Sequence, residues 1–268
     1  MRTLAQSLKQ TATVGTRIPL PWPALDRTLE LATKELNLVP GAPGAGKSVF
    51  ALNLAMSQTT PVLYLALDDA SSVLARLSAL ELGVEIRWAI DQMRDPDLKA
   101  RMIGEVGDPH PNLFIEDGAL TIEGIESRLE ALTEVLGTAP PLVILDNLID
   151  LIVPGYSYTD MGFYSTCLPE LKAMAKRHNV CILALHHVTR RGGESQNPHG
   201  LGTRALKMTD LLYSGEREAA HVIGVYHSVQ KDRMFVQILK QRDGDADPEG
   251  GLQIPLLWHP KLGSLGRA

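Results

Sequence analysis

Short, almost wholly apolar segments alternate along the chain with longer segments of helical period, and this alternation constrains the fold most. Strands that are buried on both faces are apolar throughout, and parallel strands need a crossover connection, which is usually a helix. The pattern therefore predicts an α/β fold with a mainly parallel central sheet flanked by helices. The expected strands are Leu36–Val39, Val62–Leu67, Leu113–Ile115, Leu142–Leu145, Cys181–Leu185, Val222–His227, Met234–Lys240 and Leu252–Trp258.

The helical segments and the remaining stretches complete this organisation. Gly137 and Asn179 suit helix ends, where a left-handed residue is needed. Residues 1–35 carry three closely spaced prolines and are expected to form an N-terminal arm ahead of a single domain at 36–268. The last two expected strands should form a C-terminal hairpin. The expected helices are Ser48–Ser57, Ser72–Leu82, Ile122–Leu136 and Met161–Arg177.

Composition narrows the class of protein. With 44% apolar and 21% charged residues, the 268-residue chain is typical of a globular protein and not of a disordered or collagen-like one. No apolar run reaches the roughly 18 residues that span a bilayer, and the N-terminus lacks an apolar signal segment, which predicts a cytoplasmic protein. Cys167 and Cys181 lack metal-ligand spacing, so we expect both in the core.

The charge is distributed unevenly. The chain has a net charge of −5, but twelve basic and five acidic residues between Leu171 and Arg242 give that segment +7 and leave −12 elsewhere. Six of the eight histidines also lie in it. One basic face on an acidic body is typical of a protein that meets a polyanion at a single surface, although a solvated charge excess without a partner is the alternative.

A glycine-rich motif lies between the first expected strand and the first expected helix. Residues 41–48 match G-x-x-x-x-G-K-[ST] at every fixed position. In this motif backbone N–H groups wrap the phosphates, the lysine reaches the β- and γ-phosphates and the serine hydroxyl binds Mg²⁺. The residues expected to bind ATP are Gly41, Ala42, Pro43, Gly44, Ala45, Gly46, Lys47, Ser48 and Val49.

A second component of a magnesium site ends the strand Leu142–Leu145. Asp146 follows this apolar strand, where its carboxylate can lie beside the metal, so Ser48 and Asp146 are the expected metal residues. Asn147 comes next, so the acid-then-glutamate arrangement of ABC and AAA+ ATPases is missing. No Asn-Lys-x-Asp motif occurs either, which argues against a GTPase.

The strand after the phosphate motif ends in two acids, Asp68 and Asp69. An acid there can orient the attacking water, so Asp68 is the candidate general base. The order of motifs resembles the RecA-fold ATPase core of DnaB-type replicative helicases. The segment Tyr64–Asp69 followed by Arg76-Leu is similar to the plasmid RepA-type hexameric helicases. The resemblance places Asp68, one methylene shorter, at the catalytic glutamate of that family; helix capping is the alternative role, favoured for Asp69.

The strand Cys181–Leu185 leads into His186 and His187. The resemblance puts His187 in the position of a polar sensor, which reports the state of the γ-phosphate to the loop that follows. For His186 a packed, hydrogen-bonded role is expected. Adjacent strand residues point to opposite faces, which argues against a shared zinc ion.

A long polar loop rich in glycine follows the expected sensor at residues 189–209. DnaB-like proteins hold DNA here, so the resemblance implies binding of single-stranded DNA. No aromatic residue in this loop can stack on a base, and contacts to the phosphate backbone should dominate. A solvated loop without a ligand is the alternative. The expected DNA-binding residues are Arg190, Arg191, Arg204 and Lys207.

Lys240 and Arg242 end the penultimate expected strand. In DnaB-type proteins a Lys-x-Arg at this place acts as an arginine finger on the neighbouring subunit. The resemblance therefore implies catalytic roles for both residues in a homo-oligomeric ring, which is expected to be a hexamer. An exposed basic pair on an edge strand is the alternative.

The expected function is that of an oligomeric Mg-ATP-dependent ATPase that acts on single-stranded DNA as a translocase or helicase. Two alternatives stay open at this point. One is a DNA-processing nuclease on a RecA-like platform, with Asp68, Asp69, His186 and His187 near a divalent metal. The other is a slow ATP-dependent recombination mediator or a KaiC-like switch.

Overall fold

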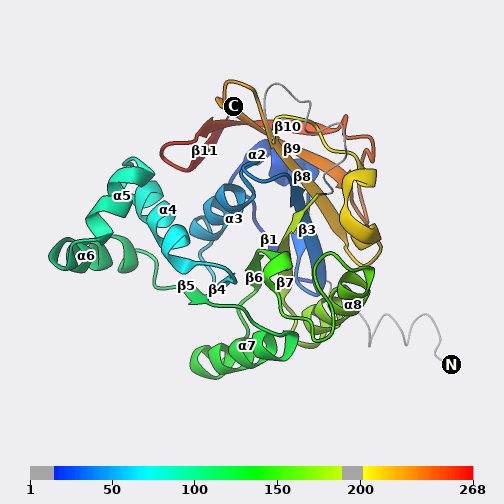
Figure 1. Ribbon diagram of the computed structural model, residues 1–268, viewed down its shortest axis with the longest axis horizontal. Helices are drawn as coiled ribbons and strands as arrows, with labels where there is room; N and C mark the ends of the chain where they lie inside the picture. The colour runs from blue at the N-terminus through cyan, green and yellow to red at the C-terminus, as the bar shows by residue number, and fades with distance from the viewer. Residues whose placement is uncertain (1–14, 189–201, 268) are drawn as a thin grey trace.

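A nine-stranded sheet forms the centre of the computed structural model, which describes residues 15–188 and 202–267 (Figure 1). The strand order is β11-β10-β9-β8-β3-β7-β6-β4-β5. The six strands from β8 to β5 in this order are parallel to one another. Strands β9, β10 and β11 each run antiparallel to the strand before them in the sequence. The predicted parallel sheet and C-terminal hairpin are confirmed. The strands are β3 (Glu35–Gly41), β4 (Val62–Ala66), β5 (Leu113–Asp117), β6 (Leu142–Asp146), β7 (Cys181–His187), β8 (His221–His227), β9 (Arg233–Lys240), β10 (Gln253–His259) and β11 (Ser264–Arg267).

Helices cover both faces of this sheet. Each face of the sheet has its own apolar core. Helices α3 and α4 pack on one face, and α7 and α8 pack on the other. Helices α5 and α6 continue from α4 beyond the β5 edge (Figure 1). No helix in residues 15–188 or 202–267 is both long and apolar enough to cross a membrane. The helices are α2 (Pro23–Thr28), α3 (Lys47–Met56), α4 (Ala70–Leu82), α5 (Ile86–Met93), α6 (Pro96–Met102), α7 (Ile122–Leu136) and α8 (Met161–Arg177).

The ends of two helices confirm the predicted stops. Gly137 follows α7 with a φ of 72°, and Asn179 lies just beyond α8 with a φ of 55°. In both places the left-handed conformation turns the chain back toward the sheet.

The segment before β3 packs into the main core. Strands β1 (Arg17–Ile18) and β2 (Leu31–Ala32) form a small antiparallel pair. Trp22 stacks on Phe50 of α3 with ring centroids 5.1 Å apart, and its Nε1 donates to the Leu265 carbonyl at 3.2 Å. The described part of the predicted arm therefore supports the helix of the phosphate motif, whereas the domain boundary at residue 35 stays a prediction.

Candidate active site

The glycine-rich motif forms the loop between β3 and α3. Gly46 caps α3 with a φ of 99°, a left-handed conformation that favours glycine. A Cβ built on Gly46 would lie 2.3 Å from Met234 Cε, so β9 packs directly behind the loop. The loop therefore needs glycine here for both its conformation and its packing.

Lys47 is almost fully buried at the start of α3. Its Nζ donates to the carbonyl oxygens of Gly41, at 2.9 Å, and Ala42, at 3.3 Å. Burial lowers the pKa of Lys47 to about 8, although the nearby Asp146 carboxylate acts in the opposite direction. A buried ammonium gains from an anionic partner, which a nucleotide phosphate provides.

Ser48 and Asp146 come together beneath the loop. Ser48 Oγ donates to Asp146 Oδ1 at 3.2 Å, and Tyr64 Oη donates to Asp146 Oδ2 at 2.6 Å. Tyr64 lies in β4 and is fully buried, and this burial, reinforced by the Asp146 charge, raises its pKa so that it remains a donor. Tyr64 is not among the site residues expected from sequence, although a tyrosine in a buried aliphatic strand needs a partner for its hydroxyl.

These residues fit magnesium-bound ATP. A hydroxyl and a carboxylate at hydrogen-bond distance are the oxygen ligands that Mg²⁺ prefers. The glycine-rich backbone at a helix N-terminus suits phosphate groups, and the buried Lys47 supplies positive charge. The candidate site thus lies at the carboxyl ends of β3 and β6.

Three further acids lie near the ends of β4 and β6. Asp68 is exposed just after β4, and Asp69 caps α4 by accepting from Ser71 N at 2.9 Å. The hydrogen bonds from Ser71 lower the pKa of Asp69. The capping interpretation of Asp69 is therefore confirmed. Burial raises the pKa of Asp150, with further contributions from the charges of Asp68 and Asp146, so Asp150 belongs to this acidic group although the sequence analysis missed it.

The two adjacent histidines differ in their surroundings. His186 is completely buried, and its ring lies 5.3 Å from that of Tyr164. His187 ends β7 and pairs in register with Gly41, so it lies beside the first residue of the phosphate motif. This is where a sensor of the bound nucleotide would have to lie, and the sensor role itself stays a prediction.

Lys240 and Arg242 lie at the opposite end of the sheet. Lys240 Nζ donates to the carbonyl oxygens of Glu216, at 2.6 Å, and Ala219, at 2.7 Å, and burial lowers its pKa. Arg242 Nη1 donates to Glu35 Oε1 at 3.1 Å, and Glu35 is the first residue of β3. Neither cation is near the phosphate loop of its own chain.

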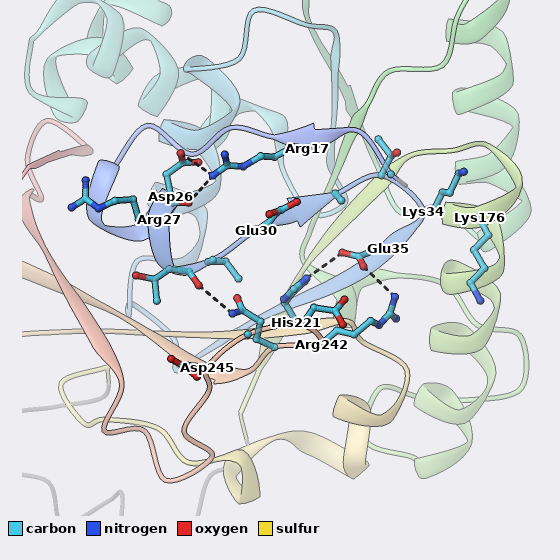
Figure 2. Close-up of a pocket in the computed structure, with 18 residues that line it drawn as sticks. Arg17, Asp26, Arg27, Glu30, Lys34, Glu35, Lys176, His221, Arg242 and Asp245 are labelled. Atoms are coloured by element: carbon cyan, nitrogen blue, oxygen red, sulfur yellow. Dashed lines mark hydrogen bonds and ion pairs between the residues drawn. The ribbon is translucent and has the colours of Figure 1, made fainter. Parts of the chain in front are cut away.

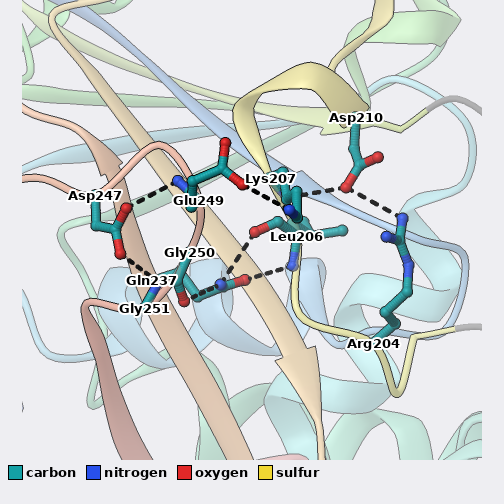
Figure 3. A network of polar contacts seen from close by, with 9 residues as sticks. All are labelled: Arg204, Leu206, Lys207, Asp210, Gln237, Asp247, Glu249, Gly250 and Gly251. Carbon is teal, nitrogen blue, oxygen red and sulfur yellow. Dashed lines mark hydrogen bonds and ion pairs between the residues drawn. The ribbon is translucent and has the colours of Figure 1, made fainter.

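The predicted DNA-binding residues fall into two groups. Arg190 and Arg191 lie outside the described residues. Arg204 pairs with the buried Asp210 at 3.1 Å, and Lys207 pairs with Glu249 at 2.5 Å (Figure 3). Both described cations thus have an acidic partner, and their contact with DNA stays a prediction.

Gly202 connects this region to the phosphate loop. Its carbonyl accepts from His227 N at 2.8 Å, and a Cβ built on it would lie 3.0 Å from Ala45 Cα. The backbone of the predicted DNA loop therefore touches the phosphate motif at Gly202. Nothing in the sequence pattern indicates this contact.

Comparisons with known proteins agree with this geometry. Residues 28–193 match the AAA domain family AAA_25. In this chain the residue that follows Asp146 is Asn147 and not a glutamate. The "Gene 65 protein" of Mycobacterium phage L5 is 27% identical over 93% of this chain and 92% of its own length. The "Replicative DNA helicase DnaB" of Buchnera aphidicola (Schizaphis graminum) is 30% identical over 81% of this chain but 49% of its own length, so the chain spans about half of that relative.

Among solved structures, the fold is similar to that titled "ATPase Domain of G40P". The TM-score is 0.77 at 21% identity, and the match covers 98% of this chain and 96% of that one. The strand order, the phosphate motif and these similarities agree. The chain belongs to the AAA domain family AAA_25 and is an ATPase with a RecA-like fold, similar to the ATPase domains of DnaB-like helicases.

Proposed function

We propose that this chain is the motor core of an oligomeric, Mg²⁺-dependent ATPase that acts on single-stranded DNA as a translocase or helicase. One observation carries the oligomeric part of the proposal. Lys47 contacts the last residue of β3 and Arg242 contacts the first, so the two cations lie at opposite ends of one strand. An arginine finger from this chain would have to serve the nucleotide of a second copy.

Within one chain, the residues at the carboxyl ends of β3, β4 and β6 have separate roles in ATP binding and hydrolysis. Lys47 binds the β- and γ-phosphates, and Ser48 and Asp146 hold the magnesium ion while Tyr64 fixes the orientation of the Asp146 carboxylate. Mg²⁺, when bound, offsets negative charge on the phosphates. Asp68 accepts a proton from the attacking water, and its exposed position after β4 gives it access to solvent.

The DnaB similarity and the basic segment support DNA as the polymer. The relative of Buchnera aphidicola is titled a replicative DNA helicase. In this chain Lys207 pairs with Glu249 on the surface, where exposed ion pairs are weak, so a phosphate group can replace the carboxylate. Contacts of this kind depend on salt and not on base sequence.

The test is ATP turnover at several protein concentrations, with and without single-stranded DNA and with varied Mg²⁺. We expect the rate per subunit to rise with protein concentration and DNA, and Lys47→Ala to abolish it. Turnover independent of protein concentration would contradict an oligomeric site. Tight nucleotide binding with slow turnover that ignores DNA would instead favour the ATP-dependent switch.

No observation favours the nuclease alternative. Asp69 is engaged as a helix cap, and His186 is packed inside the core. In the described part of the chain, the one group of three potential metal ligands lies elsewhere, where the two acids of α7 are near the end of α8; it consists of Glu126, Glu130 and His178.

A further inference from the structure

The side chain of Arg242 lies at the rim of a polar cavity of about 1280 Å³ (Figure 2). The Arg242 side chain is 48% exposed, and its guanidinium contacts the carboxylate of Glu35, whose side chain is 14% exposed. A long side chain at a rim of this kind samples many rotamers unless a neighbour fixes it. Glu35 is the residue in position to do so.

The Glu35 carboxylate is itself fixed from inside the sheet. His221 Nε2 donates to Glu35 Oε2 at 3.1 Å, while Oε1 accepts from Arg242. His221 is 5% exposed, and its Nδ1 has no hydrogen-bond partner within the described ranges, so its bond to Glu35 is the polar contact that holds the ring. Both residues lie on paired parallel strands, β3 and β8, which are rigid supports.

The residues before Arg242 are anchored separately. Lys240 bonds to two backbone carbonyls, and Gln241 Nε2 donates to the Thr28 carbonyl at 3.1 Å. The backbone that carries Arg242 is therefore held in place. What Glu35 adds is the direction of the guanidinium.

We infer that Glu35 is a positioning residue for Arg242, with His221 orienting Glu35, so that the guanidinium is preorganised to enter the site of a second copy. This inference rests on the proposed function. A preorganised donor reaches a transition state without losing rotamer freedom at that moment, and a charged carboxylate holds guanidinium better than a neutral amide does. Neither Glu35 nor His221 contacts the nucleotide of its own chain.

The first experiment compares Glu35→Gln with Glu30→Gln, an exposed acid that lines the same cavity and offers a matched loss of charge. We expect Glu35→Gln to lower the kcat of DNA-stimulated ATP turnover by about tenfold, with the KM for ATP unchanged, because a misplaced group loses transition-state contact. Glu30→Gln should leave both constants unchanged. An unchanged or raised kcat for Glu35→Gln would overturn the inference.

Mixed assemblies then separate positioning from a general defect in β3. Lys47→Ala and Arg242→Ala subunits are mixed first, and restored turnover establishes that the finger acts between copies. Glu35→Gln mixed with Lys47→Ala should also restore turnover, since a Lys47→Ala subunit still supplies an intact finger. Glu35→Gln mixed with Arg242→Ala should turn over ATP no faster than Glu35→Gln alone, because the only fingers present then come from Glu35→Gln subunits and are misplaced.

The outcomes distinguish the two levels of the account. No restoration with Lys47→Ala and Arg242→Ala contradicts the proposed function itself. A second outcome is that the mixture of Lys47→Ala and Arg242→Ala recovers turnover and that Glu35→Gln mixed with Arg242→Ala also exceeds the rate of Glu35→Gln alone. That outcome overturns only the role of Glu35, because it places the Glu35→Gln defect in the nucleotide site of its own subunit. If Glu35→Gln does not fold, His221→Gln takes its place in the same mixtures, with the same expected pattern and the same contradicting one.

Discussion

Lys47 and Arg242 contact opposite ends of the same strand: Lys47 Nζ bonds to the Gly41 carbonyl, and Arg242 Nη1 bonds to the Glu35 carboxylate. Strand β3 runs from Glu35 to Gly41, and at about 3.3 Å per residue its ends are about 20 Å apart. No side-chain rotation closes that distance. A single chain therefore holds both halves of the expected catalytic pair but cannot join them.

Tyr64→Phe removes one donor from the Asp146 carboxylate. We expect the Mg²⁺ concentration for half-maximal ATP turnover to rise several-fold, because Asp146 loses its fixed orientation. The free energy of unfolding should fall by about 2 kcal/mol, the contribution of a buried hydrogen bond to a charged group. Tyr158→Phe, at an exposed position, is the control. A Mg²⁺ titration identical to that of the unaltered protein would refute the role of Tyr64.

The lowered pKa of Lys47 makes stability depend on pH. Its ordinary value of 10.5 applies to the unfolded chain and the value of about 8 to the folded one, so the unfolded chain binds more protons between these values. The penalty for burying the charge is complete below pH 8 and disappears as the pH rises toward 10.5. It amounts to about 3 kcal/mol.

The measurement is urea unfolding of nucleotide-free protein at pH 7 and pH 10, for the unaltered chain and Lys47→Met. Lys47→Met should be the more stable of the two at pH 7, and its advantage should shrink at pH 10. Subtracting the free energy of unfolding of one protein from that of the other cancels the contribution of the other groups that titrate in this range. An advantage that stays constant with pH would show that burial of the Lys47 charge is not its source.

Gly202→Ala tests the contact behind the phosphate loop. The new methyl group would lie 3.0 Å from Ala45 Cα, so the loop must shift, and we expect the Kd for ATP to rise about tenfold. Gly118→Ala is the matched control, since Gly118 also has a positive φ but nothing near its Cβ. Both variants should lose similar stability from backbone strain. Equal Kd values for the two variants would contradict the coupling.

Arg204 and Lys207 should separate in their effects. Arg204→Ala removes the Arg204 ion pair of the buried Asp210 and should lower the free energy of unfolding by about 3 kcal/mol. Lys207→Ala breaks an exposed pair and should cost less than about 1 kcal/mol while weakening DNA binding and its salt dependence. Chemical denaturation and DNA titrations at two salt concentrations check both. Equal losses of stability would show that the burial of Asp210 is unimportant.

The parallel sheet and the phosphate motif could be predicted because their signals are local. Apolar runs such as Val62–Ala66 and Leu142–Asp146 read as buried strands, and Gly137 marks the end of α7. Helices α5 and α6 were missed because their segment carries many charged residues and only a narrow apolar stripe. Strand β11 was missed because it is only four residues long and begins directly after Gly263, which has a positive φ.

The contacts that complete the site depend on residues far apart in sequence. Tyr64 reaches Asp146 only because β4 and β6 are neighbours, and Gly202 reaches Ala45 only because a distant loop end returns to the phosphate motif. The pairing of Glu35 with Arg242 likewise joins residues 207 positions apart. Sequence spacing carries no information on such contacts, whereas the sheet order determines them.

The most direct test of the account is ATP turnover in mixtures of Lys47→Ala and Arg242→Ala subunits. Each variant alone should be nearly inactive, since a finger contributes about 10³-fold or more to the rate. The mixture should recover a fraction of the unaltered rate, because intact phosphate loops then meet intact fingers. Arg94→Ala, which removes an exposed arginine far from both, should leave the rate unchanged. No recovery at any mixing ratio would contradict a site shared between copies.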